Sequence, residues 1–487
     1  MAALEKTSEA KIVRMTTQPV DRLILKLAVP TIISMMVTAF YNLADTFFIR
    51  QLESDSMVAA VGVALPLMNI IQAVGFYHGH GSGNYISRAY GRRDLKDAEN
   101  MAAAGFFFAM LFGLLLSVSG LLLRRRLAWV LGAKTEDTMV NCVSYMKYIL
   151  MAAPLMMGSI VMNNQLRMQG NALFSMFGLA SGAIVNLILD PVLIFQAGDA
   201  IGIGGLRAAF GAGMGVAGAA LATALSQCLS FTVLAIGMGR SDNVKIRLKN
   251  FQPTPHYVKG IMQGGLPSLA RQGIASIATA SLNHAVGLYL TGTMLIDAAQ
   301  AAMTGVNRIM MLLASVLIGF GQGFQPVCGF NYGAKRYDRV IEAFRFCVKL
   351  AAVVLTALAA VGFAFAGPIT DTVAGTSPEA SAIAVFAFRA QLVTLPLHAW
   401  IVLSNMMLQN IGATAKATTL AIARQGLAFI PMVLLLPLLF RSLGASPLLG
   451  VQLAQPVADL FSFAIAIPIG LSELRRMSVE NNRLSEH

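Results

Sequence analysis

Charged residues are scarce in this chain of 487 residues. Only 12% of them are Asp, Glu, Lys or Arg, whereas 56% are hydrophobic. Soluble domains carry about 25% charged residues, so this chain lacks the polar surface that a soluble protein of its size needs. The mean hydropathy of +0.68 is typical of a protein that is dissolved in a lipid bilayer. We therefore predict a membrane protein.

Cysteines and catalytic motifs are also scarce. The four cysteines are widely separated and form no CxxC motif, which excludes a secreted disulfide scaffold. The chain contains no HExxH or GxSxG motif, so we expect neither an enzyme nor a cofactor. The glycines between Gly79 and Gly83 lack the Lys-Ser or Lys-Thr that follows a phosphate-binding loop, and close helix packing is the better explanation for them.

Long apolar runs dominate what remains. A helix that crosses a bilayer needs about 20 mainly apolar residues, and twelve stretches meet this length. They are residues 24–49, 57–84, 98–123, 139–165, 173–196, 214–238, 260–289, 297–326, 341–366, 380–408, 417–440 and 448–472. The predicted fold class is an all-α polytopic membrane protein with twelve transmembrane helices. We expect no cleavable signal peptide before the first span.

Lys and Arg residues concentrate on one side of these spans. The N-terminus, the even-numbered connections and the C-terminus carry most of them, including Arg92-Arg93 and Lys335-Arg336. Cytoplasmic segments of membrane proteins are enriched in Lys and Arg, so we expect both termini in the cytoplasm and the protein in a bacterial inner membrane. The same rule explains the net charge of +13 without a nucleic acid as partner.

The sequence repeats itself at an offset of 242 residues. Residues 79–94 resemble residues 321–336, and the same offset relates Pro154 to Pro396 and Asn163 to Asn405. Six spans per repeat give both halves the same orientation, which is typical of transporters with parallel repeats. We predict a cytoplasmic tail at 1–22, an N-lobe at 23–238, a cytoplasmic linker at 239–259, a C-lobe at 260–472 and a cytoplasmic tail at 473–487, with the first tail solvated.

Two acidic residues lie inside the predicted spans. Asp45 follows Tyr41 by four residues, and Asp190 follows Asn186 by four, so each acid shares a helix face with its polar neighbour. Charged groups within a bilayer are costly and mark functional sites. Such carboxylates can load a proton or bind a small hard cation through oxygen ligands. The alternative is that each acid only completes structural hydrogen bonds near a helix end.

Four motifs together resemble one family. They are Asp45-Thr-Phe-Phe-Ile49 in span one, Ser87-Arg-Ala-Tyr-Gly91 after span two, Asn186-Leu-Ile-Leu-Asp190-Pro191 in span five, and the segment from Gly215 to Thr223 in span six. Across nearly its whole length the chain resembles the multidrug and toxic compound extrusion (MATE) transporters. The resemblance implies two pseudo-symmetric six-helix lobes and a cation site in the N-lobe. Its residues would be Tyr41, Asp45, Asn163, Asn186, Asp190 and Thr223.

The second half departs from one branch of this family. That branch has an acid in span seven, where this chain has Arg271, so we expect the cation site in the N-lobe only. Arg271, Arg308, Arg389 and Asp459 are expected to form structural pairs rather than to take part in transport. Pro30, early in span one, is a predicted gating hinge because proline leaves a backbone carbonyl free and permits a bend.

The predicted function is secondary active export of amphipathic, cationic drugs by alternating access. The exchanged ion is H⁺ or Na⁺, and the sequence leaves that choice open. The only metal expected is Na⁺ at Asp45, Asn186, Asp190 and Thr223. We expect a monomer whose partners are small organic cations and the bilayer. The alternative is a flippase for a lipid-linked or polar conjugate, which would need a cavity with many basic residues.

Overall fold

The computed structural model describes residues 2–52, 54–199, 211–240, 243–290, 293–371 and 377–486. In the part of the chain so described, helices dominate, and strand pairing is limited to a single bridge between Gln196 and Ala212. This agrees with the predicted all-α fold class. Most of the predicted glycine-rich loop between spans five and six falls within 200–210, which lie outside the described residues.

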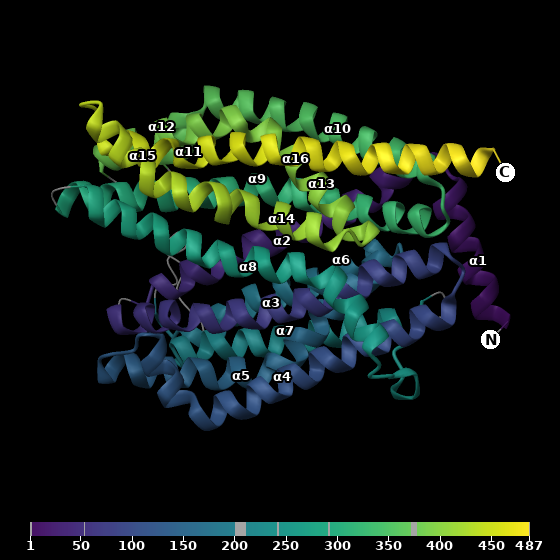
Figure 1. The fold of residues 1–487 in the computed structure, drawn as a ribbon. Helices are drawn as coiled ribbons and strands as arrows, with labels where there is room; N and C mark the ends of the chain where they lie inside the picture. Colours follow the sequence, from purple (N-terminus) through teal and green to yellow (C-terminus); the bar gives the residue numbers. More distant parts are fainter. Residues whose placement is uncertain are drawn as a thin grey trace. The chain divides into compact units, whose positions relative to one another are not determined.

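Every predicted span contains helix. The first six spans are α2 (Val20–Arg50), α3 (Asp55–Gly91), α4 (Leu95–Leu131), α5 (Glu136–Met168), α6 (Ala172–Ile194) and α7 (Val216–Met238). The next three are α8 (Pro255–Tyr289), α9 (Thr293–Gly333) and α10 (Tyr337–Ala364). Neighbours in sequence pack together, as α4 and α5 do side by side in Figure 1.

The last three spans are interrupted or extended helices. Span ten consists of α12 (Pro378–Thr394), the 3₁₀ turn η2 (Leu395–Leu397) and α13 (His398–Ile411). Span eleven consists of α14 (Thr414–Ile422), the π-helical segment η3 (Ala423–Phe429) and α15 (Ile430–Ser442). Span twelve is α16 (Pro447–Ser485), and two short elements, η1 (Leu248–Asn250) and α11 (Ala366–Asp371), lie between spans.

Eleven segments of the described chain are long and apolar enough to cross a membrane. The segment that does not reach this level is α8, the seventh predicted span. It is 35 residues long, which is sufficient for a crossing, but polar residues such as Arg271 and His284 dilute its apolar character. We assign it as a span because the repeat requires a counterpart to α2.

The N-terminal segment differs from the expected solvated tail. Residues Ala2–Thr17 form helix α1, and Ile12 and Met15 are buried. Lys11 is also buried, and its ammonium group donates to the Asn243 side chain at 3.1 Å. The expectation of a solvated tail is wrong. Helix α1 has 16 residues, which is too short for a membrane span, but its apolar side chains Ile12 and Met15 are buried against the rest of the protein.

Close packing divides the chain into two units. Unit 1 comprises residues 1–14 and 29–265, and unit 2 comprises residues 15–28 and 266–487. Three helices therefore contribute to both units: α1 changes unit after Arg14, α2 after Ala28 and α8 after Gly265. In α2 and α8 a proline, Pro30 or Pro267, stands two residues after the change.

The repeat is visible in the backbone. Arg93 and Lys335, which are 242 residues apart, both adopt the left-handed conformation that L residues rarely take, with φ of 63° and 59°. Gly170 and Gly412 form a second such pair, with φ of 80° and 82°. Equal turns at equal positions confirm that the two halves are structural copies.

Candidate functional site

One face of α6 carries four residues at intervals of four: Gly178, Gly182, Asn186 and Asp190. This spacing places them in one row along the helix. A Cβ atom at position 182 would lie 3.0 Å from the Cβ of Ser230 and 3.1 Å from the carbonyl oxygen of Ser226 on α7. Small residues of this kind let two helices in a membrane approach closely. The glycine end of the row thus brings α6 against α7.

The other end of α6 is fixed by the segment that precedes α7. Backbone N–H groups between residues 212 and 215 donate to the carbonyls of Val192, Leu193 and Ile194 at 2.9–3.0 Å. Gly213 and Gly215 supply the left-handed turns that these bonds need, with φ of 61° and 55°. The last carbonyls of α6 are therefore satisfied within the protein, as burial in a membrane requires.

Asp190, Asn186 and Thr223 form the polar centre of this helix pair. All three are buried, and Asp190 has an exposed fraction of 0%. The Asn186 amide nitrogen lies 3.4 Å from Asp190 Oδ1 and 3.5 Å from Thr223 Oγ1. The reversed amide orientation improves both bonds: the nitrogen then donates to Asp190 Oδ2 at 3.2 Å, and the oxygen accepts from the Thr223 N–H at 3.3 Å. Asn186 connects the acid to α7 in either orientation.

Asp45 and Tyr41 on α2 belong to the same charged region. Both side chains are partly buried. Asp45 interacts electrostatically with Asp190, and both acids interact with the hydroxyl groups of Tyr41 and Tyr145. Tyr145 on α5 is buried, and its hydroxyl donates to the sulfur of Met68 at 3.3 Å. Nothing in the local sequence distinguishes Tyr145 from Tyr148, three residues further on, so Tyr145 was not predicted.

This region has an excess of negative charge. Within the described ranges, neither Asp45 nor Asp190 forms an ion pair with Lys, Arg or His. A search of the same residues finds no cluster of three or more His, Cys, Asp and Glu side chains suited to a metal ion. The donor set instead consists of carboxylate, amide and hydroxyl oxygens. Such a set suits a proton or a small hard cation.

Asn163, which was also predicted for the cation site, lies away from Asn186 and Asp190. Its amide donates to the carbonyl and the hydroxyl of Ser175 at 2.9 and 2.7 Å. Ser175 precedes Asn186 by eleven residues, which is about 16 Å along a helix. The repeat explains this bond, because Asn405 donates to the carbonyl of Ala417 at 2.7 Å in the equivalent place. The predicted cation-binding role of Asn163 remains untested, but its placement indicates that it joins α5 to α6.

Unit 2 contains a buried acid of its own, Asp459 on α16. It accepts hydrogen bonds from Arg424 Nε at 2.7 Å and from Thr394 at 3.1 Å, and His398 Nε2 lies 2.9 Å away. Arg424 belongs to the π-helical segment η3, and such segments often occur at functional sites. The expected structural pairing of Asp459 is thus present in the structure, although its partner Arg424 was not anticipated.

The other basic residues of unit 2 have different surroundings. Arg389 donates from Nε to the Phe363 carbonyl at 3.3 Å and lies over the Phe363 ring. Arg271, where one branch of the resembling family has an acid, is partly buried on α8. Position 271 therefore holds a basic side chain where a cation site in unit 2 would need an acid.

Comparison with known proteins identifies the family. The family model MatE matches residues 30–192 and 274–435, once in each half of the repeat. The chain belongs to the MatE family. These proteins are membrane transporters of the multidrug efflux type, with twelve helices in two lobes, and the expected family, fold class and membrane location are thereby confirmed.

Individual MatE relatives are similar over nearly their full length. "Multidrug export protein MepA" of Staphylococcus aureus (strain MSSA476) is 26% identical over 473 residues, covering 96% of this chain and 97% of the relative. MepA of Staphylococcus haemolyticus (strain JCSC1435) is 25% identical over 461 residues, covering 94% and 95%. A solved "outward-facing conformation of a multidrug resistance MATE family transporter" has a TM-score of 0.84 at 26% identity, covering 96% of this chain and 98% of that one.

Proposed function

We propose that this MatE transporter exports amphipathic organic cations in exchange for H⁺ or Na⁺. The proposed coupling site consists of Asp190, Asp45, Asn186, Thr223 and Tyr41. One observation supports it above the others: Asp190 is completely buried, yet it has no cationic partner among the described residues. An ionised group without a partner is costly inside a membrane. The site is therefore poised to take up a positive charge.

The charge balance explains why exchange would result. A proton or Na⁺ at Asp190 and Asp45 supplies the missing positive charge, and an organic cation near the same acids would supply it as well. Each inorganic ion bound there lowers the negative charge of the two acids by one, so its binding weakens the attraction for the drug. In unit 2 the Asp459 carboxylate already has its counter-charge in Arg424. We therefore propose that coupling is confined to unit 1.

The two prolines provide a means of alternating access. Pro30 and Pro267 lie inside α2 and α8, and neither has the backbone N–H that would donate a helical hydrogen bond to the carbonyl four residues before it. Each proline stands where its helix passes from one packed unit to the other. We propose that α2 bends at Pro30 when the acids are loaded, which changes the packing around Asp45. Prolines in helices are the usual site of such kinks.

The orientation of the chain in the membrane and its oligomeric state complete the proposal. Both termini would lie in the cytoplasm, because Lys and Arg concentrate on that side. The transporter would act as a monomer in the bacterial inner membrane. No second function has comparable support, because a flippase for anionic conjugates would require basic residues around the buried polar centre, where Asp190 and Asp45 stand instead.

Transport in proteoliposomes tests the proposal. Ethidium efflux by the purified chain is measured under a pH gradient and under a Na⁺ gradient imposed separately, and one of them should drive it. Asp190→Asn keeps the size and hydrogen bonding of the side chain but removes its charge, so neither gradient should drive efflux. The matched control is Asp137→Asn, which alters an exposed acid of unit 1 and should leave efflux unchanged. Gradient-driven efflux by folded Asp190→Asn protein at the wild-type rate would refute the site.

A further inference from the structure

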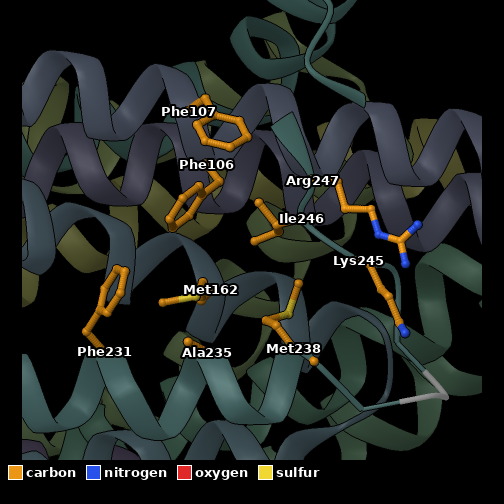
Figure 2. Close-up of a pocket in the computed structure, with 10 residues that line it drawn as sticks. Phe106, Phe107, Met162, Phe231, Ala235, Met238, Lys245, Ile246 and Arg247 are labelled. Carbon is orange, nitrogen blue, oxygen red and sulfur yellow. The ribbon is translucent and has the colours of Figure 1, made fainter. Parts of the chain in front are cut away.

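Unit 1 contains a cavity of about 310 Å³ that the transport mechanism does not use. It lies between α4, α5, α7 and the segment that follows α7, and Figure 2 shows the side chains around it. Ligand sites typically have volumes from about 300 Å³ upward. The cavity is therefore large enough for part of a small molecule or one segment of a lipid chain.

The lining is apolar at one end and basic at the other. Phe106, Phe231 and Met162 surround the apolar end, whereas the charged groups of Lys245 and Arg247 lie beside each other at the opposite end (Figure 2). In the part of the chain that the structure describes, neither cation forms an ion pair. The cavity thus matches a molecule with an apolar tail and an anionic head, and it repels the organic cations proposed as cargo.

The segment that carries the two cations is held at both ends. At its start, the Asn243 amide donates to the Gly237 carbonyl at 2.9 Å and the Val244 N–H donates to Gln169 Oε1 at 2.8 Å. At its end, the Phe251 ring lies 5.5 Å from the Phe107 ring and 5.3 Å from the Phe108 ring. The segment that carries Lys245 and Arg247 is therefore held by buried hydrogen bonds at its start and by partly buried ring contacts at its end.

We propose that this cavity binds an anionic glycerophospholipid of the bilayer. One acyl chain would lie against the Phe and Met side chains, and the phosphate would lie between Lys245 and Arg247. The segment belongs to the connection that the positive-inside pattern places in the cytoplasm, where membrane surfaces carry anionic lipids and basic pockets between helices bind their headgroups. A bound lipid would join α4 and α7 to the connection between the halves of the chain.

Lipid retention by the full chain tests this proposal without any transport measurement. Purified protein in detergent is titrated with palmitoyl-oleoyl phosphatidylglycerol or with phosphatidylcholine of the same chains, and bound lipids are counted by native mass spectrometry. The wild type should bind phosphatidylglycerol more tightly. Each cation near an anionic headgroup corresponds to about a fivefold change in affinity, so Lys245→Gln/Arg247→Gln should weaken phosphatidylglycerol binding roughly 25-fold.

Two matched variants separate this cavity from general surface charge. Lys249→Gln removes a cation of the same segment that does not line the cavity and should leave binding within twofold of wild type. Ala235→Phe should fill the cavity and abolish the preference, whereas Ile236→Phe, at an exposed neighbouring position outside the lining, should not. Equal effects of Lys249→Gln and the double substitution would overturn the proposal. So would displacement of the lipid by inorganic phosphate at equal concentration, because the apolar end would then contribute nothing.

Discussion

Replacing Asp459 by Asn would remove the charge that balances Arg424 in unit 2. The carboxylate has an exposed fraction of 0% and receives hydrogen bonds from Arg424 and Thr394, with Gln455 donating a further one at 2.9 Å. After the substitution, the guanidinium group would keep its position with one weaker acceptor in place of a carboxylate. The variant therefore removes the charge of Asp459 while the size of the side chain stays nearly the same.

The expected loss follows from the burial of the two partners. Removing one member of a buried ion pair costs about 3–5 kcal/mol of the free energy of unfolding. Arg424 has an exposed fraction of 29%, so water partly compensates its lost partner, and we expect about 2–3 kcal/mol. The double variant Asp459→Asn/Arg424→Met should lie within about 1 kcal/mol of wild type, because a buried ion pair replaced as a whole is often close to neutral.

Thermal unfolding in detergent measures this difference. At about 2–4 °C per kcal/mol, the single variant should unfold about 5–10 °C below wild type, and the double variant should recover most of that loss. Ion-driven efflux by the double variant should still respond to the coupling gradient. A loss in the double variant equal to the sum of the losses in Asp459→Asn and Arg424→Met would refute the pairing argument. A folded double variant without any ion response would show that coupling extends to unit 2.

Three further predictions concern the hinge, the helix pair and the repeat. Pro30→Ala should lower the efflux rate several-fold while the dissociation constant for ethidium stays within about twofold, and an unchanged rate would leave Pro30 without a gating role. Gly182→Val should separate α6 from α7 and abolish ion-driven efflux. The control Gly287→Val, at a position with open space around it, should retain ion-driven efflux. Equal efflux by the two variants would contradict the close-packing argument. Asn163→Ala and Asn405→Ala should each cost about 1–3 kcal/mol of the free energy of unfolding and keep the ion response, and its selective loss in Asn163→Ala would restore Asn163 to the coupling site.

The membrane architecture was predictable because apolar length is a local property. Each span needs a run of about 20 apolar residues, and every run so found contains helix. The N-terminal helix α1 escaped this criterion, since its burial depends on a few residues such as Met15 that contact distant parts of the chain. The π-helical segment η3 also gave no local sign, because a change in helix type follows from packing rather than from composition.

The polar centre that we propose as the coupling site was predictable where its residues share a helix. Asn186 and Asp190 stand four apart on α6, so their proximity followed from spacing alone. The contact with Thr223 was expected only from the family resemblance, and Tyr145 was not expected at all. Arg424 precedes Asp459 by 35 residues on another helix, and no periodicity relates the two. Contacts between helices depend on how the helices are rotated, which a single sequence does not specify.

The repeat shows where the two halves have diverged. Positions that shape the backbone keep their character at the offset of 242, as Arg93 and Lys335 do, and so does the bond from Asn163 that recurs at Asn405.

The buried acids do not recur. The counterpart of Asp190 is Met432, and the counterpart of Asp459 is Ala217. A scaffold that is duplicated in packing but not in charge can load an ion in one half alone. Asp459 of unit 2 has its own counter-charge in Arg424, whereas Asp190 and Asp45 of unit 1 form no ion pair among the described residues. In the proposed mechanism, ion loading would therefore change the net charge of unit 1 only. The bend that we propose in α2 would then have no equivalent in α8, although both helices carry the proline that permits it.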